Sequence, residues 1–226
     1  MYFVEKNITR LRNHQPTFFL DPKELRDVQS KLKRGEYSIY SPYLDSEKKI
    51  LYTNQEPDVL LYEIKCRSTL RHQDILGSMY SLNIDKGLFG DIIIIDGNYY
   101  IYILSIVRNY FESNFLRVKN SSVELSLVEL DTLKDYERSY IEEEYIVSSL
   151  RIDTLISSIC HTNRGNINSM ISKKEILLNY DSLKNSSYVL KENDVFSIKR
   201  IGKYRFVGII KNTKRNHYIV KVLKYL

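Results

Sequence analysis

The first 57 residues show the least regular pattern of apolar and polar positions. Asp21 followed by Pro22 indicates a helix start, because aspartate caps helix N-termini and proline is tolerated at the first helical position. Apolar residues then recur at helical spacing as far as Leu32. We expect short strands over residues 37–43 and 49–52, on either side of a polar turn. The pattern predicts a small N-terminal α/β unit over residues 1–57.

A sharper pattern begins at residue 58. The expected strands cover residues 60–66, 91–96, 99–104 and 123–128, and the expected helices cover 69–82 and 106–116. This βαββαβ order is that of the ferredoxin-like fold, which RNA-recognition (RRM) domains share. The four isoleucines 92–95 indicate a strand that is buried on both faces. We expect the charged stretch 134–144 to be a solvated helix or a linker, so the RRM-like domain with its linker spans residues 58–144.

The last third of the chain changes to two short helices followed by strands. Ile152, Leu155, Ile156 and Ile159 form one apolar helix face, and Arg164 opens a second short helix. Strands are expected over residues 176–179 and 195–200, with a turn at 191–194 between them. Further strands follow residue 200, with a basic rim that includes Lys214 and Arg215. The whole chain is therefore predicted to be α+β, with residues 145–226 as its third domain.

Charge separates this third domain from the rest of the chain. Residues 145–226 hold 15 Lys and Arg against 5 Asp and Glu, a net charge of +10. Residues 1–144 hold 19 against 23, a net charge of −4. A basic end on a mildly acidic body indicates that this end meets a polyanion. The alternative is an ordinary solvated basic surface.

Several classes of protein do not fit the sequence. Cys66 and Cys160 lie far apart and outside any CxxC pair, so we expect buried thiols and neither a disulfide nor a zinc site. No apolar run approaches the ~20 residues that span a bilayer, and the N-terminus lacks the apolar core of a signal peptide. We therefore expect a cytoplasmic protein that needs no cofactor. Asp58 and Glu63 imitate a nuclease pattern, but five residues apart on one strand they face opposite sides.

The third domain resembles the S4 family of RNA-binding domains. The matching residues are Arg151 and Asp153 in an Arg-x-Asp motif, Arg164 at the start of the second helix, and Asn179 at a strand end. The chain departs from the family at two glycines, where it has Lys174 and Asn193, and Asn163-Arg164 replaces the common Ser-Arg pair. Asn193 tolerates a positive φ, whereas Lys174 implies a different or strained turn.

The resemblance and the charge together predict an RNA site. Arg151 and Arg164 suit bidentate phosphate contacts, and Asp153 is expected to orient an arginine or to cap a helix. The alternative is that the two arginines form only surface ion pairs. The predicted RNA-binding residues are Arg151, Asn163, Arg164, Lys173, Lys174, Asn179, Lys199, Arg200 and Lys203. In the middle domain, Tyr99, Tyr100 and Tyr102 could stack on bases, but packing is the preferred interpretation because no RNP1 pattern is present.

Longer segments resemble the bacterial YlmH family across nearly the whole chain. The matching segments are Phe18–Glu24, Leu70–Ser78, Leu88–Ile93 and Val147–Asp153. The resemblance implies an N-terminal unit, an RRM-like middle and a C-terminal S4 domain. It also implies association with ribosomal RNA of the large subunit and with peptidyl-tRNA, in ribosome-associated quality control with C-terminal tailing.

Three functions stay in competition at this point. The first is a non-catalytic, monomeric RNA-binding factor, with possible protein partners through its N-terminal unit. The second is an RNA-modifying or RNA-cleaving enzyme with an S4 targeting domain, although residues 1–144 are short for such a catalytic domain and carry neither a His-x-Gly-His nor a Lys-Met-Ser-Lys-Ser signature. The third is a cell-division-linked interaction protein, which would leave the basic third without a purpose.

Overall fold

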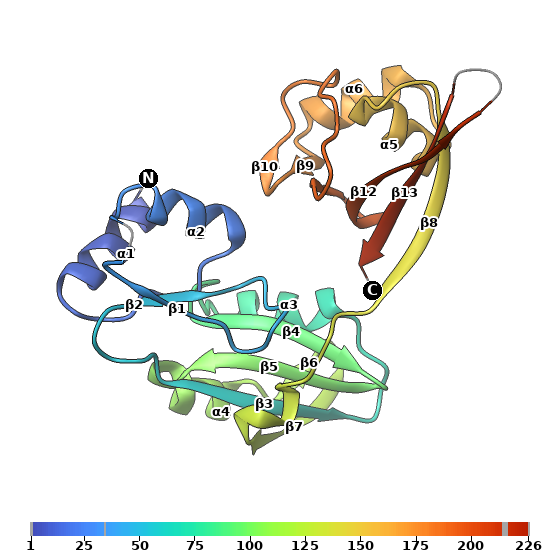
Figure 1. Ribbon diagram of the computed structural model, residues 1–226. Coiled ribbons are helices and arrows are strands. Elements are labelled where there is room, and N and C mark those ends of the chain that lie inside the picture. The colour runs from blue at the N-terminus through green and yellow to red at the C-terminus, as the bar shows by residue number, and fades with distance from the viewer. Residues whose placement is uncertain (1, 34, 214–216, 226) are drawn as a thin grey trace. The chain divides into compact units, whose positions relative to one another are not determined.

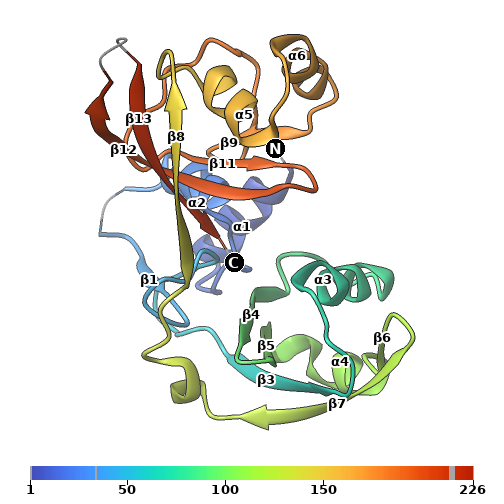
Figure 2. The ribbon, with the colours of Figure 1, turned by 90° about the vertical axis from the view of Figure 1, so that its right-hand side faces the viewer.

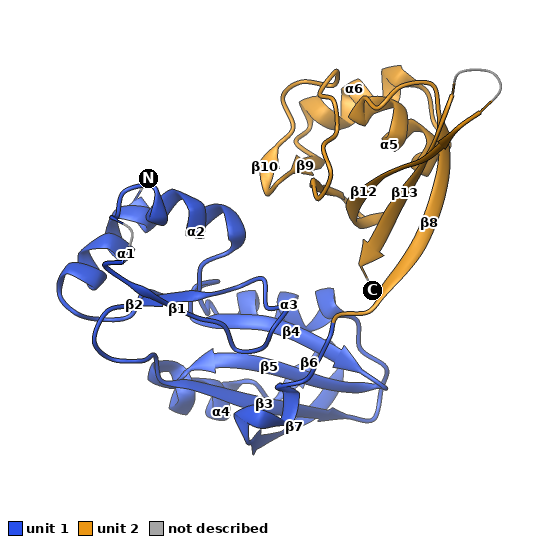
Figure 3. Ribbon diagram, viewed as in Figure 1, with its two compact units in different colours: residues 1–137 blue, residues 138–226 orange. Residues whose placement is uncertain are grey.

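The computed structural model describes residues 2–33, 35–213 and 217–225. The chain divides into two compact units, residues 1–137 (unit 1) and 138–226 (unit 2) (Figure 3). Residues 1–57 therefore share one compact unit with the expected middle domain. Lys214 and Arg215, expected on the basic rim, lie outside the described residues.

Unit 1 is mixed α/β. Its helices are α1 (Tyr2–Arg12), α2 (Pro22–Gln29), α3 (His72–Ser81) and α4 (Arg108–Asn114), with 3-10 turns η1 (Ser105–Val107) and η2 (Leu130–Leu133). Its strands are β1 (Ser38–Tyr40), β2 (Ile50–Tyr52), β3 (Val59–Cys66), β4 (Phe89–Ile95), β5 (Asn98–Leu104), β6 (Arg117–Val118) and β7 (Ser121–Val128). The predicted alternation of strands and helices after residue 58 is confirmed, with the two-residue strand β6 added.

The helix start at Asp21 is confirmed in detail. The Asp21 carboxylate accepts a hydrogen bond from the Glu24 backbone at 2.8 Å, and the Glu24 carboxylate accepts one from the Asp21 backbone at 3.1 Å. This capping box satisfies two backbone donors that would otherwise lack partners. Helix α1, in contrast, was not predicted. Its packing depends on Asn7, whose side chain accepts from the Phe18 backbone at 2.8 Å, a contact that periodicity cannot show.

The main sheet of unit 1 is antiparallel, in the order β4-β5-β3-β7-β6. Its first face packs against α3 and α4, with Ile75, Met79 and Phe111 buried in that core. Its second face is covered by the N-terminal segment, which contributes Phe19 and other buried side chains. Figure 1 shows α1, α2 and the β1–β2 pair over this sheet. The first face is therefore covered by helices, whereas the second is covered only in part: on the side of β3 that carries Leu61, Glu63 is half-buried and Lys65 is exposed.

One strand of this sheet differs from its prediction. The isoleucines 92–95 do form β4, but β4 lies at the edge of the sheet and not inside it. Ile92 and Ile93 are buried, one in each core, whereas Ile94 is 39% exposed. The strand is therefore buried on both faces at Ile92 and Ile93 but not at Ile94, because an apolar run does not reveal which strand will be outermost.

Unit 2 is a sheet with two helices on it. The strands are β8 (Tyr140–Val147), β9 (Ile176–Leu178), β10 (Asp181–Ser182), β11 (Val195–Ile198), β12 (Gly202–Asn212) and β13 (Tyr218–Tyr225). They run in the order β10-β9-β11-β12-β13-β8, and every neighbouring pair is antiparallel. Helices α5 (Ile152–Cys160) and α6 (Arg164–Ser172) lie against this sheet (Figure 2). Their apolar residues are buried around Phe196 and Tyr204.

The charged stretch 134–144 was predicted wrongly. Its second half enters β8, which pairs with β13 along eight residues, so the expected boundary at residue 144 falls inside a strand. The reason is electrostatic. Glu142 pairs with Lys221 at 2.6 Å, and Glu143 pairs with Lys224 at 3.6 Å. Cross-strand pairs of opposite charge stabilise a sheet, so an acidic block that resembles a linker in isolation fits beside a basic strand.

Candidate nucleic-acid interface

Two arginines of unit 2 converge on one buried carboxylate. The side chain of Asp153 is 3% exposed and accepts hydrogen bonds from Arg151, at 3.1 Å from Nε and 2.7 Å from Nη2. Arg164 Nε lies 3.6 Å from the same carboxylate. The side chains of Arg151 and Arg164 are 33% and 60% exposed, respectively. We name this cluster the Asp153 clamp: one buried anion holds two cations whose remaining donors face solvent.

Local backbone geometry places the clamp. Arg151 is the extended residue before α5, and Arg164 is the first residue of α6. Between the helices His161 takes a left-handed φ of 48°, which turns the chain sharply before α6. Asn163 then caps α6 by accepting from the Asn166 backbone at 3.0 Å. The two arginines are therefore positioned by a helix start and a cap, and the expectation that Asp153 orients an arginine is confirmed.

The charges of the clamp support one another. Burial acts to raise the pKa of Asp153, but hydrogen bonds from Arg151 and the charges of Arg151 and Arg164 prevail and hold that pKa below its ordinary value. The hydrogen bond to Asp153 in turn raises the pKa of Arg151. The carboxylate therefore stays ionised at neutral pH, and its hydrogen bonds hold the guanidinium of Arg151 in one orientation. An arginine held in this way loses less conformational entropy when it contacts a phosphate.

A second group of predicted residues lies at the other end of α6. Lys173 caps that helix, and Lys174 follows with a left-handed φ of 56°. Glu175, the next residue, pairs with Lys199 at 3.8 Å, and its carbonyl accepts from the Lys199 backbone at 2.9 Å. Arg200 follows Lys199 in an exposed turn. These four basic residues surround one strand end and form a patch separate from the clamp.

The expectation of a different or strained turn at Lys174, where the S4 pattern has glycine, is confirmed. A lysine occupies a left-handed conformation that favours glycine, so the turn is strained. Asn193 likewise has φ 68°, which an asparagine accepts more readily.

Asn179 and Lys203 belong to neither group. The amide of Asn179 donates to Asp194 at 2.7 Å and accepts from the Val195 backbone at 3.0 Å, so it ties two strands together. Lys203 donates to the Tyr180 hydroxyl at 3.0 Å and lies over the rings of Tyr180 and Tyr225. The geometry gives Asn179 a structural role, and the sequence alone did not distinguish it from a surface residue.

An aromatic and basic cluster beside Lys203 was missed. Arg205 donates to the hydroxyls of Tyr140, at 2.9 Å, and Tyr225, at 3.0 Å, and its guanidinium lies over both rings. The three residues come from β12, β8 and β13, and the separation of residues 140 and 225 along the chain hid their proximity. The two tyrosine rings meet edge to face, with centroids 5.1 Å apart. Each of these three side chains is half-buried.

Two of the three tyrosines that could stack on bases are buried, and the third, Tyr100, is half-buried beside the core of the second sheet face. Tyr99 is 4% exposed and its hydroxyl accepts from the Leu70 backbone, and Tyr102 is fully buried beside the N-terminal segment. Stacking of a base needs an exposed ring face. The packing interpretation of Tyr99 and Tyr102 is therefore confirmed.

The remaining candidates are the acidic pair Asp58 and Glu63, possible metal ligands and the two cysteines. Glu63 pairs with Lys65 at 3.6 Å, while Asp58 precedes β3. Among the described residues, no group of three or more His, Cys, Asp or Glu is arranged to hold a metal ion. Cys66 and Cys160 are free thiols and half-buried, not fully buried as expected. No helix in the described part of the chain is long and apolar enough to cross a membrane.

Comparisons with known proteins agree with these observations. Residues 54–132 match the family model described as "Putative RNA-binding domain in YlmH". The chain is 22% identical over 217 residues to the "Ribosome-associated protein quality control protein P2" of Bacillus subtilis (strain 168), a match that covers 90% of this chain and 84% of that protein. A solved structure, "Cell division protein ylmH from Streptococcus pneumoniae", is 21% identical, with a TM-score of 0.48, and covers 59% of this chain and 93% of that chain. The resemblance to the YlmH family is thereby confirmed, and residues 54–132 of this chain carry the domain that the family's model describes.

Proposed function

We propose that this protein is a non-catalytic RNA-binding factor of ribosome-associated quality control. Under this proposal unit 2 contains an S4 domain, roughly residues 145–205, which binds RNA of the large ribosomal subunit and peptidyl-tRNA in the cytoplasm. The β12–β13 pair forms its basic extension. In unit 1, the strand order β4-β5-β3-β7 supports the proposal that the middle of the chain is an RRM-like domain.

The observation that carries the proposal is the Asp153 clamp. Two arginines held by one buried carboxylate, in a region of net charge +10, form a prepared contact for phosphate groups. A pair of surface ion pairs would leave both partners exposed, whereas here the anion is 3% exposed and the cations keep free donors outward. The second patch, with Lys173, Lys174, Lys199 and Arg200, adds a longer track for an RNA backbone.

The ribosome is the proposed target because the relative from Bacillus subtilis is named for ribosome-associated quality control. Its match runs along 90% of this chain, so both units take part in the resemblance. The enzyme alternative is disfavoured because residues 1–144 are short for such a catalytic domain and carry neither of its signature motifs. The proposal therefore assigns binding, not chemistry, to unit 2.

The test is co-sedimentation of the full chain with purified ribosomal subunits at low and moderate salt. Wild type is compared with Arg151→Ala/Arg164→Ala, and the expected result is arginine-dependent pelleting with the large subunit. Each lost phosphate contact should also reduce the slope of log affinity against log salt by about 0.7–0.9. Lys221→Ala/Lys224→Ala is a matched control, because it removes two positive charges that already pair with glutamates.

Removal of Arg151 leaves Asp153 with fewer partners, so Arg151→Lys/Arg164→Lys is tested as well. This variant keeps both charges but loses the forked donor geometry, and we expect weakened pelleting from a folded protein. A folded wild type that pellets with neither subunit would refute the ribosomal assignment. Equal pelleting of wild type and both arginine variants would refute the clamp as the contact.

A further inference from the structure

Unit 1 contains a second buried carboxylate that holds two cations. The side chain of Asp74, in the first turn of α3, is 5% exposed. It accepts hydrogen bonds from the Arg71 backbone and side chain at 3.0–3.3 Å, and Lys119 Nζ lies 2.9 Å away. The side chains of Arg71 and Lys119 are 65% and 54% exposed. The construction repeats that of the Asp153 clamp with different residues in a different fold.

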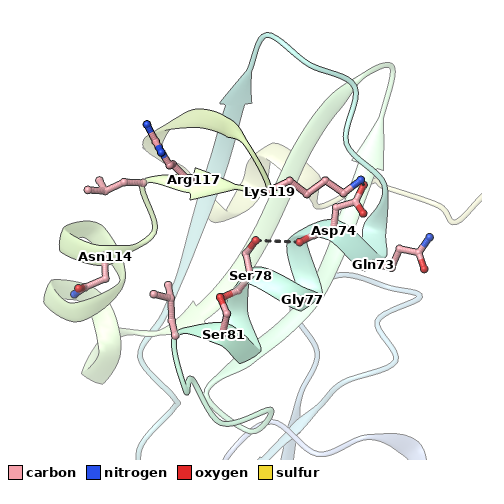
Figure 4. A pocket seen from close by; sticks show the side chains of 10 residues that line it. Gln73, Asp74, Gly77, Ser78, Ser81, Asn114, Arg117 and Lys119 are labelled. Atoms are coloured by element: carbon pink, nitrogen blue, oxygen red, sulfur yellow. Dashed lines mark hydrogen bonds and ion pairs between the residues drawn. The ribbon is translucent and has the colours of Figure 1, made fainter.

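Asp74 and Lys119 line an open pocket. The pocket has a volume of about 600 Å³ and is lined by one side of α3, the end of α4 and the β6–β7 hairpin. Figure 4 shows Lys119 reaching towards Asp74 while Gln73 and Asn114 line other parts of the pocket. Lys119 sits in the hairpin turn with a left-handed φ of 53°. The hydrogen bonds of Arg71 explain why the pKa of Asp74 lies well below its ordinary value.

Basic residues gather on both sides of this hairpin. A second pocket, of about 660 Å³, contains Lys65 and Arg67 beside the start of β7, while Arg117 and Lys119 line the first. We call Lys65, Arg67, Arg71, Arg117 and Lys119 the basic strip; all five are exposed. Unit 1 holds 18 Lys and Arg against 20 Asp and Glu, a net charge of −2, so this concentration is local. The carboxylates beside the strip are Asp74, Glu124 and Glu63.

The chemistry of the strip points to a sugar–phosphate backbone. No aromatic side chain lines either pocket, so a base would find no ring to stack on. The polar lining instead offers hydroxyls and amides, from Ser68, Ser122 and Gln73 among others, which suit phosphate oxygens and ribose hydroxyls. The N-terminal segment covers the part of the second sheet face that holds Leu61 and Tyr102, and Lys65 lies exposed on the uncovered part of that face.

We propose that the basic strip of unit 1 is a second RNA-binding surface, which recognises the backbone of double-stranded RNA. The inference rests on the proposed function as an RNA-binding factor, and it adds unit 1 to the parts of the chain that bind RNA. Two surfaces on one chain raise the overall affinity through effective concentration when both reach the same RNA. Recognition through the backbone is largely independent of sequence and strongly dependent on salt.

The test measures binding of the full chain to a labelled 16-base-pair RNA duplex by fluorescence anisotropy, over a series of salt concentrations. The main variant is Arg67→Glu/Arg117→Glu, because neither side chain contacts Asp74 and both are exposed, so folding is not at risk. Arg71→Ala/Lys119→Ala tests the cation pair itself. Lys33→Glu/Lys134→Glu is the matched control, an equal change of charge at exposed positions of unit 1 outside both pockets.

We expect the main variant to bind about tenfold more weakly, with a salt slope reduced by about 2, and the control to change little. Arg151→Ala/Arg164→Ala is measured in parallel, so that a failure of the proposed function can be distinguished from a failure of this inference. If only Arg151→Ala/Arg164→Ala loses affinity for the duplex, the basic strip does not bind RNA, and an acidic protein becomes its candidate partner instead. If the control loses as much as the main variant, or wild type does not bind the duplex, the inference is overturned.

Discussion

Replacement of Asp153 by asparagine isolates the contribution of the buried carboxylate. Asp153→Asn keeps the shape of the side chain but removes the negative charge that accepts from Arg151 at 2.7 and 3.1 Å. Hydrogen bonds to charged groups contribute about 1.5–3 kcal/mol and neutral ones about 0.5–1.5 kcal/mol. Since Arg151 is partly exposed and screened by solvent, we expect the variant to lower the free energy of unfolding by about 1–2 kcal/mol at neutral pH.

The pH dependence gives this prediction its sharpest test. The pKa of Asp153 is lowered in the folded protein, so its stabilising effect is fully present above the unfolded value near 3.9 and is lost as pH falls through the folded value. Urea unfolding at pH 7, 5, 4 and 3 should show a constant difference between wild type and Asp153→Asn that shrinks below about pH 4. Glu192→Gln, at an exposed carboxylate of unit 2, serves as control.

Two results would refute this reasoning. The first is a variant as stable as wild type at pH 7, and the second is a stability difference that does not shrink in acid. RNA affinity supplies an independent readout. The substitution removes one negative charge, so charge alone predicts tighter RNA binding. Loss of the orienting carboxylate predicts weaker binding and a smaller difference in affinity between specific and non-specific RNA. We expect the weaker binding.

Four shorter predictions follow from single side chains. Gly90→Ala should destabilise unit 1 by about 1–3 kcal/mol in urea unfolding, because the added Cβ would lie 2.9 Å from Cβ of Tyr102. Lys174→Gly should raise the stability of unit 2 by up to ~1 kcal/mol by relieving a left-handed φ, and no gain would refute the strain. Asn179→Ala should cost about 1–3 kcal/mol, yet the folded variant should bind RNA like wild type. Burial raises the pKa of Tyr204 to about 12, so its contribution to stability should hold up to pH ~10 and fall between 10 and 12, which unfolding curves together with a tyrosinate titration would detect.

Local sequence determined much of this protein. The helix start at Asp21 and the helices α5 and α6 follow from caps and from apolar spacing, which act within a few residues. The alternation of strands and helices after residue 58 and the basic character of the last third were equally accessible. The Arg151–Asp153 contact was predictable because its partners are two residues apart.

Tertiary structure decided what depends on residues far apart in the chain. Glu142 and Glu143 pair with lysines that lie some eighty residues later in the chain, on the neighbouring strand β13. The N-terminal segment covers part of the second sheet face because Phe19 and Tyr102 share one core, a contact that no periodicity encodes. The pair of Arg71 and Lys119 on Asp74 likewise exists only after the hairpin folds against α3. Periodicity reports which face of an element is apolar, but the partner of that face is chosen by packing and charge over the whole fold.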